Sequence, residues 1–208
     1  MPIYHDDIIQ GTDEWYSVRL GKFTASDFHV MLGKSQSKTD KLWEVVFERI
    51  THNTDQENFT TFAMERGKIL EVEARRLYSA IGETEIRETG FVEPDKDNPW
   101  YGFVGVSPDG LVGEDGGLEI KSPLGKNFLQ WTKVNEDGIR TVEYIKPEYK
   151  TQVELTLMIT GREWWDFCYY HPLLGIAVKR ITSDPELREK ITNSLNECIE
   201  FIKEQTQE

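Results

Sequence analysis

The fold and the chemistry of this chain are decided by two short segments, Ser107-Pro108-Asp109-Gly110 and Gly117-Leu118-Glu119-Ile120-Lys121. An aspartate in a Pro/Gly turn is followed ten residues later by a Glu-x-Lys triplet. Residues i and i+2 of a strand lie on the same face of a sheet, so Glu119 and Lys121 are predicted to point one way and Ile120 into the core. Two carboxylates about 4 Å apart repel by roughly 4 kcal/mol at an effective dielectric constant near 20. The pattern therefore predicts a site that needs a cation, and Mg²⁺ with oxygen ligands suits it.

Each half of this pattern also has an ordinary structural explanation. Pro108-Asp109-Gly110 is common turn chemistry, and Glu119 and Lys121 could be charged residues on the exposed face of a strand. The two halves together favour hydrolysis of phosphodiesters. A divalent cation between two carboxylates lowers the pKa of water and stabilises charge on phosphoryl oxygens, and the lysine can orient the water or assist its deprotonation. A nuclease is therefore the leading hypothesis.

The composition is that of an ordinary globular protein. At 208 residues, with 38% hydrophobic and 29% charged residues, the chain can build one sizeable core, and we expect a single domain over residues 1–208. No run approaches the ~18 apolar residues of a membrane span, and residues 1–7 lack the features of a signal peptide. Cys168 and Cys198 lack metal-ligand spacing and are expected to be buried thiols. These features predict a cytoplasmic protein that does not contact a membrane.

The net charge of −13 argues against a nucleic-acid partner at first sight. Contacts from Lys and Arg to phosphates supply most of the nonspecific affinity for DNA. Net charge governs solubility and steering, however, and a local groove can carry the opposite sign. If DNA is the partner, we expect an acidic exterior with a small basic groove.

The hydrophobic periodicity predicts a single mixed α/β layer structure. Helical spacing covers both ends of the chain, and the middle changes to short apolar runs between Asp, Asn, Pro and Gly turns. Residues 34–38 are expected to form a polar loop. The expected helices cover 24–31, 42–50, 61–81, 128–133, 147–160 and 187–202, and the expected strands cover 85–93, 100–107, 117–121, 164–170 and 176–181, the last two as a hairpin.

Glu71 lies on the long helix and is a further candidate for the acidic site. It could pair with Arg75 as an ordinary (i, i+4) ion pair on a solvated face. Gly67 costs ~1 kcal/mol relative to alanine inside a helix. A close approach of the backbone to the sheet at Gly67 would justify this cost and aim Glu71 at the metal.

Two more groups of polar residues have functional and structural interpretations. Gln152 follows Pro147 on a predicted helix, where it could be exposed or could hydrogen-bond to water or a substrate phosphate. Arg19 with Ser26 at a helix start could form a phosphate pocket. The same two residues could equally be a surface arginine and a helix cap.

Taken together, these segments resemble the lambda-type exonucleases, or YqaJ-like viral recombinases, of the PD-(D/E)XK nuclease superfamily. The resemblance runs across most of the chain, and the order of six short motifs makes it specific. It implies a single α/β domain with a central mixed β-sheet flanked by helices, similar to restriction endonucleases. The matching segments are Trp15…Arg19, Thr24-Ala25-Ser26, Gly67-Lys68…Glu71, Ser107-Pro108-Asp109-Gly110, Leu118-Glu119-Ile120-Lys121 and Tyr149…Gln152.

The resemblance implies a processive, magnesium-dependent exonuclease, with Mn²⁺ expected to substitute for Mg²⁺. Such an enzyme degrades the 5′ strand of double-stranded DNA ends and leaves a 3′ overhang for phage-type recombination. The resemblance also implies a homotrimeric ring around DNA and a single-strand annealing protein as partner, in the cytoplasm of a bacterial host. An endonuclease of the same superfamily and a non-catalytic acidic DNA mimic remain as alternatives.

By position, the resemblance also assigns a catalytic site. Asp109, Glu119 and the Ile120 carbonyl would bind the metal, and Glu71 would complete the acidic cluster. The attacking water would be served by Lys121 and Gln152.

The resemblance assigns DNA contacts in the same way. Met64 would be the apolar wedge that splays the terminal base pair. The second arginine of the family's phosphate pocket falls near Gln36 in this chain, and Lys34 and Lys38 are the candidates to replace it. The 5′-phosphate would be held by Arg19, Ser26 and Ser107, with Lys126 as a further contact to the DNA backbone.

Overall fold

The computed structural model of the protein describes residues 1–54 and 62–207, with side chains described for residues 1–54 and 65–207. Its helices are α1 (Asp13–Arg19), η1 (Phe28–Leu32, a 3₁₀ helix), α2 (Gln36–Thr51), α3 (Phe62–Gly82), α4 (Gly125–Trp131), α5 (Pro147–Thr160) and α6 (Pro185–Thr206). Its strands are β1 (Ile3–His5), β2 (Phe23–Thr24), β3 (Ile86–Arg87), β4 (Phe91–Glu93), β5 (Val104–Gly105), β6 (Gly110–Val112), β7 (Gly116–Lys121), β8 (Thr132–Val134), β9 (Arg140–Val142), β10 (Trp164–His171) and β11 (Gly175–Thr182). A seven-stranded mixed sheet has the order β3-β6-β7-β10-β11-β9-β8, and β1-β4 and β2-β5 form two small sheets.

The middle of the large sheet consists of β7, β10 and β11. β10 pairs parallel with β7 and antiparallel with β11. Alternate residues of β10 enter different cores, with Trp165, Phe167 and Tyr169 on one face and Cys168 on the other. A Cβ on Gly117 would lie 2.2 Å from the Trp165 ring. Glycine at this position, two residues before Glu119, therefore allows β7 and β10 to pack.

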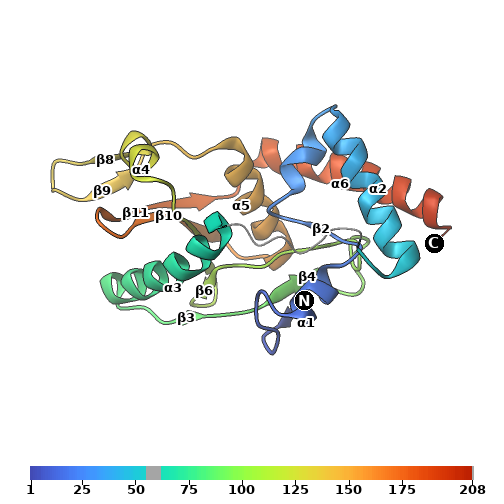
Figure 1. The fold of residues 1–208 in the computed structure, drawn as a ribbon, viewed down its shortest axis with the longest axis horizontal. Helices are drawn as coiled ribbons and strands as arrows, with labels where there is room; N and C mark the ends of the chain where they lie inside the picture. Colours follow the sequence, from blue (N-terminus) through green and yellow to red (C-terminus); the bar gives the residue numbers. More distant parts are fainter. Residues whose placement is uncertain (55–61, 208) are drawn as a thin grey trace.

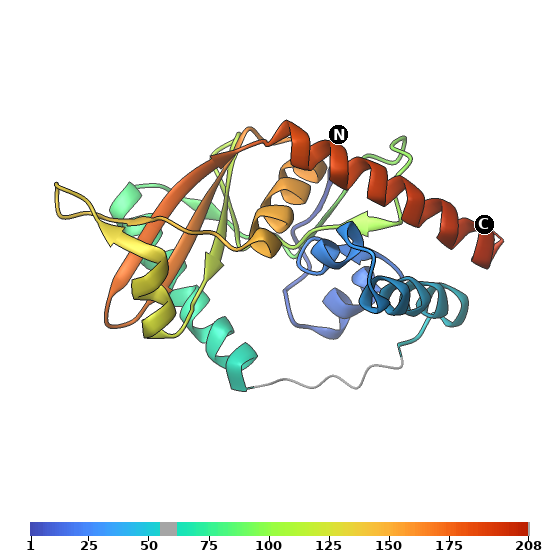
Figure 2. The ribbon, with the colours of Figure 1, turned by 90° about the horizontal axis from the view of Figure 1, so that it is seen from above.

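Helices cover both faces of the large sheet (Figures 1 and 2). Leu70 and Ala74 of α3 pack on the face that contains Cys168. Phe128 of α4 and Val153 of α5 pack on the opposite face. Because both faces are buried, the central strands can be rich in apolar and aromatic residues throughout.

A second core forms where α2, η1 and α6 gather at one end of the molecule (Figure 2). α5 belongs to both cores. Its Val153 and Leu157 face the large sheet, whereas Leu155 and Ile159 face the second core. A helix that is enclosed on all sides is held firmly in place, and α5 therefore gives Gln152 a fixed position.

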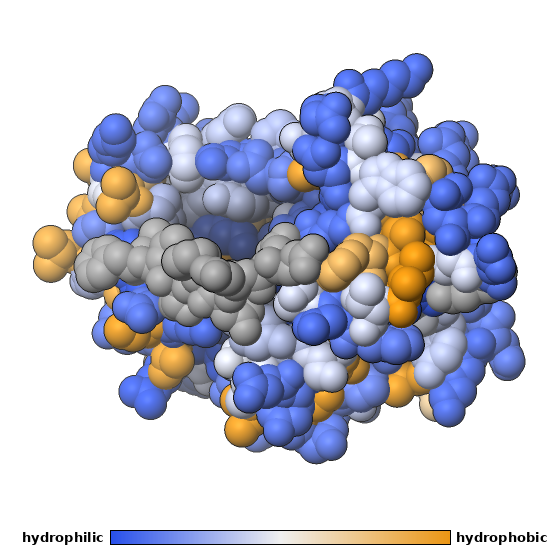
Figure 3. Space-filling view, turned by 45° about the vertical axis from the view of Figure 1, so that its right-hand side comes forward, coloured by the Kyte–Doolittle hydropathy of each residue, from blue (hydrophilic) through white to orange (hydrophobic). Residues whose placement is uncertain are grey.

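The face in Figure 3 is mainly hydrophilic, with apolar side chains in small separate patches. Within the described residues, no helix is both long and apolar enough to cross a membrane. Cys168 and Cys198 are buried and carry free thiols.

Most predicted elements of the mixed α/β fold are confirmed. α5 has the predicted bounds of 147–160, β10 and β11 form the predicted hairpin, and β7 contains the predicted strand over 117–121. The helix predicted over 128–133 is α4, which begins and ends earlier. The long helix was predicted from Thr61, which lies outside the described residues.

The prediction of one strand over 85–93 is wrong, because the chain bends between β3 and β4. β3 joins the large sheet and β4 pairs with β1. At the bend, a Cβ on Gly90 would lie 2.1 Å from the Ile8 carbonyl oxygen. The close approach of a distant backbone segment therefore separates the two strands.

Three other predicted segments also differ. Only β5 forms within the strand predicted over 100–107, because the residues before it form turns. In these turns the Phe103 N–H donates to the Trp100 carbonyl, and Gly102 has a φ of +76°. The helix predicted over 24–31 is reduced to η1, which begins after Asp27. The loop predicted over 34–38 ends early, because Ser35 caps α2 and places Lys38 in its first turn. The pattern did not predict β1, α1, β2, β6, β8 or β9.

Candidate active site

Asp109 and Glu119 reach the same place from paired strands. Asp109 immediately precedes β6, and β6 runs antiparallel to β7 with Gly110 opposite Leu118. The Ile120 N–H donates a 2.6 Å hydrogen bond to Asp109 Oδ2. Glu119 is only 1% exposed. The carboxylates are therefore built into the sheet, and the explanation as a simple turn and a surface strand is wrong.

Lys121 and Gln152 converge on one oxygen of Glu119. Lys121 Nζ lies 2.6 Å from Glu119 Oε1, and Gln152 Nε2 donates to the same oxygen at 2.7 Å. Ile120 points to the opposite face, where it packs in the core under α3. The predicted strand alternation is confirmed, and Gln152 is buried rather than exposed.

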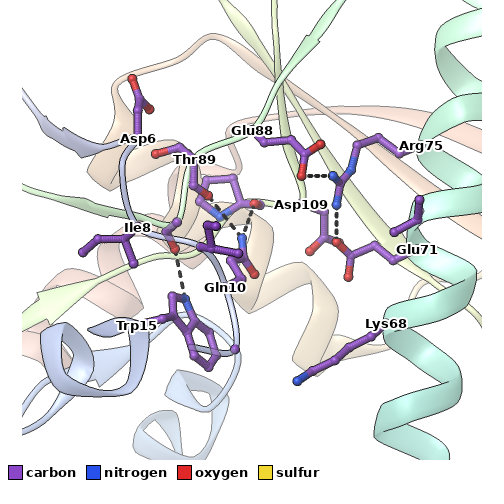
Figure 4. Close-up of a pocket in the computed structure, with 15 residues that line it drawn as sticks. Asp6, Ile8, Gln10, Trp15, Lys68, Glu71, Arg75, Glu88, Thr89 and Asp109 are labelled. Carbon is purple, nitrogen blue, oxygen red and sulfur yellow. Dashed lines mark hydrogen bonds and ion pairs between the residues drawn. The ribbon is translucent and has the colours of Figure 1, made fainter. Parts of the chain in front are cut away.

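Glu71 approaches the cluster from α3, and Arg75 holds it there (Figure 4). Arg75 Nη2 donates to Glu71 Oε1 at 2.5 Å, and Arg75 Nη1 forms an ion pair with Glu88. The predicted (i, i+4) ion pair is therefore present. It also belongs to the acidic site, because Asp109 lies close enough to Glu71 for its charge to act on it.

The prediction that Gly67 permits a close backbone approach is wrong. A Cβ at Gly67 would meet no atom within 4 Å among the described residues. The direction of Glu71 follows instead from Leu70 and Ala74, which seat α3 on the sheet, and from the bond to Arg75.

The electrostatics of the cluster are those of carboxylates crowded in a desolvated site. Burial, followed by the charge of Asp109, raises the pKa of Glu119 to about 8 and that of Glu71 to about 7. Burial also raises the pKa of Asp109. Burial alone would lower the pKa of Lys121, but the carboxylates of Glu119 and Asp109 raise it. The Lys121 ammonium therefore offsets part of the negative charge and remains a hydrogen-bond donor at neutral pH.

This donor set fits a hard divalent cation. Asp109, Glu119 and Glu71 offer carboxylate oxygens, and Ile120 can offer its carbonyl. Among residues 1–54 and 65–207, no three Asp, Glu, His or Cys side chains are grouped so that they could hold a metal ion by themselves. A cation at this site would therefore need the Ile120 carbonyl and water to complete its coordination.

A second polar cluster contains Arg19, Trp15 and Ser107. Arg19 Nη1 donates to Ser107 Oγ at 3.1 Å, and Trp15 Nε1 donates to the same oxygen at 2.9 Å. The Arg19 guanidinium lies 3.9 Å from the centroid of the Trp15 ring. Both donors point at Ser107 Oγ, so its own O–H remains available to donate to an anion.

Ser26 lies beside this cluster in a group that includes an acidic residue. Ser26 Oγ is 3.1 Å from Thr24 Oγ1, which donates to Asp27 Oδ2 at 3.2 Å. Burial lowers the pKa of Arg19, and the charge of Asp27 acts against this change. Ser26 does not cap η1, because the N-cap position is Asp27.

The other predicted DNA contacts are more scattered. Lys38 Nζ lies 3.8 Å from Glu197 Oε2 of α6. Lys34 precedes α2, Lys126 lies in the first turn of α4, and both are exposed. In the described part of the chain, no hydrogen bond or ion pair joins any of the three to Arg19 or Ser107. Met64 lies outside the described side chains.

A cavity of about 390 Å³ connects the acidic cluster with Trp15 (Figure 4). Glu71 and Asp109 line it on one side, and Lys68 points into it. Gln10 fixes its wall, because Gln10 Nε2 donates to the carbonyls of Thr89 and Pro108 at 3.2 and 2.8 Å. The second cluster reaches this cavity through Trp15, which donates to Ser107 behind the wall.

Sequence reasoning missed several residues of this site. The stacking of Trp15 on Arg19 has a local signal, since the two are four residues apart on a helix. Gln10 and Glu88 have no local signal, because their partners are distant in the sequence. Lys68 was part of a matched motif but had no assigned role.

The fold and the acidic cluster define the class of this protein as the PD-(D/E)XK nuclease fold. The chain belongs to the family described as the YqaJ-like viral recombinase domain, whose family model matches residues 14–163.

Solved structures agree with this assignment. The chain is 30% identical to the alkaline exonuclease LHK-Exo from Laribacter hongkongensis, with a TM-score of 0.78 over 94% of this chain and 95% of that chain. LHK-Exo in complex with dAMP gives a TM-score of 0.79 at the same identity and coverage. A phage-related exonuclease from Haemophilus somnus 129PT shares the fold, at 12% identity and a TM-score of 0.59 over 89% of this chain and 95% of that chain. A search of the curated proteins gave no match.

Proposed function

We propose that the protein is a magnesium-dependent 5′–3′ exonuclease that acts on ends of double-stranded DNA and leaves 3′ single-stranded overhangs. One observation carries the proposal. Asp109 and Glu71 share a single cavity with Trp15, which donates to Ser107 of the second cluster. A site for hydrolysis beside a site for a terminal phosphate suits an enzyme that starts at a DNA end. The similarity to an alkaline exonuclease supports the same conclusion.

The chemistry follows from the residues of the acidic cluster. Asp109, Glu119 and the Ile120 carbonyl would hold Mg²⁺ or Mn²⁺, with Glu71 beside them. When bound, the metal would lower the pKa of a water molecule and stabilise charge on the phosphoryl oxygens. Lys121 offsets carboxylate charge through its contact with Glu119, and it would orient the attacking water or assist its deprotonation.

Gln152 and Arg75 would hold the carboxylates in place. Gln152 donates to Glu119 from the rigid helix α5, and Arg75 donates to Glu71 from α3. Neither carboxylate can then rotate freely when its charge changes. Such preorganisation is the main contribution that a protein makes to phosphoryl transfer.

Ser107 and Arg19 would recognise the 5′-phosphate of the strand that is degraded. The Ser107 O–H can donate to a phosphate oxygen while its oxygen accepts from Arg19 and Trp15. Ser26 would donate beside them, and the charge of Asp27 would offset part of the attraction of Arg19 for the phosphate. A 5′-phosphate held here would set which bond lies at Asp109 and Glu119.

The assembly and its partner belong to the same proposal. As the resemblance to the lambda-type exonucleases implies, we expect a homotrimeric ring, which would explain processivity by keeping the DNA enclosed between steps. We also expect a single-strand annealing protein to bind the exposed 3′ strand in the cytoplasm of a bacterial host. The net charge of −13 means that any DNA channel must be locally basic.

End-labelled linear duplex and covalently closed circular duplex together test the proposal. With Mg²⁺, we expect early release of a 5′ label, late release of a 3′ label and an intact circle. Cutting of the circle would favour an endonuclease. No digestion of either substrate with Mg²⁺ or Mn²⁺ would favour a non-catalytic DNA mimic.

A further inference from the structure

An open pocket beside the active site has no role in the chemistry described above. It has a volume of about 620 Å³, and Gln130, Trp131, Tyr144, Lys146 and Glu148 line it. We call it the aromatic pocket. It lies where the end of α4 and the segment after β9 meet the start of α5.

The two aromatic rings of the pocket are held in place by the backbone. The Trp131 carbonyl accepts hydrogen bonds from the N–H groups of Glu143 and Tyr144 at 2.9 and 3.2 Å. The Trp131 ring also packs on the core residue Tyr169, with centroids 5.3 Å apart. Tyr144 remains 47% exposed, and its ring lies 6.2 Å from that of Trp131 at 51°. The pocket therefore presents an aromatic corner to solvent.

An alternating row of lysines and aromatic rings joins this corner to the active site. Lys121 Nζ lies 5.2 Å from the centroid of the Tyr149 ring. Lys146 Nζ lies 5.3 Å from the same ring and 5.4 Å from that of Trp131. Because Lys121 also contacts Glu119, the row begins at the acidic cluster itself. Basic residues interleaved with aromatic rings are typical of surfaces that bind single-stranded nucleic acid.

The charge of the pocket indicates what it can recognise. Lys146 Nζ donates to Glu148 Oε1 at 3.1 Å, so the cation already has an anionic partner. The pocket therefore offers little net attraction to phosphate. Its exposed ring faces offer stacking, which every base can accept.

We infer that the aromatic pocket stacks an unpaired base of a single DNA strand that passes the catalytic centre. The inference rests on the proposed function, because DNA must reach Lys121 for the row to guide a strand. The pocket would keep the strand aligned between cleavage steps without reading its sequence.

Binding of single-stranded DNA tests the inference separately from cleavage. The probe is a fluorescein-labelled oligothymidylate of about 12 nucleotides, mixed with the full chain in chelator and followed by anisotropy. We expect Tyr144→Ala and Trp131→Ala to raise Kd by about 5- to 150-fold. Tyr144→Phe should keep the Kd of the wild type, because the ring remains. Trp43→Ala is the matched control, since Trp43 is 50% exposed on α2 and packs on Phe201.

Two further measurements identify stacking. The ratio of variant to wild-type Kd should stay constant between low and high salt, because no phosphate contact is lost. An oligonucleotide without bases should bind to Tyr144→Ala and to the wild type with equal Kd.

The inference is overturned if Tyr144→Ala binds oligothymidylate as the wild type does, or if Trp43→Ala weakens binding equally. It is also overturned if Tyr144→Ala weakens binding of the oligonucleotide without bases. Tyr144→Ala decides the matter by itself if Trp131→Ala does not fold. Digestion of linear duplex by the wild type tests the proposed function separately, so failure of the inference is distinguished from failure of the proposed function.

Discussion

Replacing Asp109 by Asn and by Ala separates its chemical role from its structural role. Both substitutions remove the negative charge from the acidic cluster. Asn keeps an oxygen that can accept from the Ile120 N–H, a bond of 2.6 Å in the wild type, whereas Ala leaves that N–H without an acceptor. The difference between the two variants therefore isolates the hydrogen bond.

The structure gives the size of both effects. An unsatisfied N–H in the sheet costs about 1–3 kcal/mol. For a chain of this length, 1 kcal/mol shifts Tm by roughly 2–4 °C, so we expect Asp109→Ala to melt about 2–12 °C below Asp109→Asn. Loss of a metal ligand removes several kcal/mol of transition-state stabilisation, so both variants should cleave at least about 100-fold more slowly.

Thermal unfolding in chelator measures the first effect, and digestion of linear duplex with Mg²⁺ measures the second. Chelator removes any contribution of bound metal to Tm. Cleavage by Asp109→Asn at the rate of the wild type would refute the role of Asp109 in the metal site. Equal Tm values for the two variants would refute the argument from the hydrogen bond.

Three further predictions concern neighbouring residues. Burial gives Glu119 a folded-state pKa of about 8 against an ordinary value of 4.5, so its contribution to the free energy of unfolding is fully present below pH 4.5 and is lost as the pH rises through 8. Denaturant titrations in chelator should show that the wild type loses about 1 kcal/mol of unfolding free energy per pH unit across this window and that Glu119→Gln does not. Parallel pH profiles of the two proteins would contradict this. Arg75→Ala should lower kcat/KM by about 10- to 100-fold through loss of a charged hydrogen bond to Glu71, with partial recovery in Arg75→Lys and a larger change in kcat than in KM; an effect on KM alone would exclude a positioning role. Ser107→Ala should reduce kcat/KM about tenfold on 5′-phosphorylated ends and leave 5′-hydroxyl ends unchanged, whereas equal losses on both ends would argue against a phosphate contact.

The acidic cluster was predictable because its signals are local. Strand alternation correctly placed Glu119 and Lys121 on one face with Ile120 on the other. The Pro/Gly turn marked Asp109 as a turn residue, but strand β6, which begins directly after it, was not predicted. Pro147 and the apolar run after it correctly predicted both ends of α5.

The remaining features depend on contacts between distant segments. The bend at Gly90 is imposed by the backbone of Ile8, and no pattern around Gly90 reports that neighbour. Arg75 has a local partner in Glu71, but its second partner, Glu88, comes from a later segment. Because Ser35 caps α2, Lys38 lies in the first turn of that helix and not in the predicted loop. Its ammonium group therefore contacts Glu197 of α6.

The dependence of cleavage on the divalent metal tests the central claim most directly. The rate of digestion of a linear duplex would be followed from excess chelator to millimolar Mg²⁺, with the protein concentration fixed. The convergence of Asp109, Glu119 and Glu71 predicts no cleavage in chelator and a saturable rise with Mg²⁺. Digestion at full rate in excess chelator would contradict the assignment of these carboxylates to a metal-dependent nuclease site.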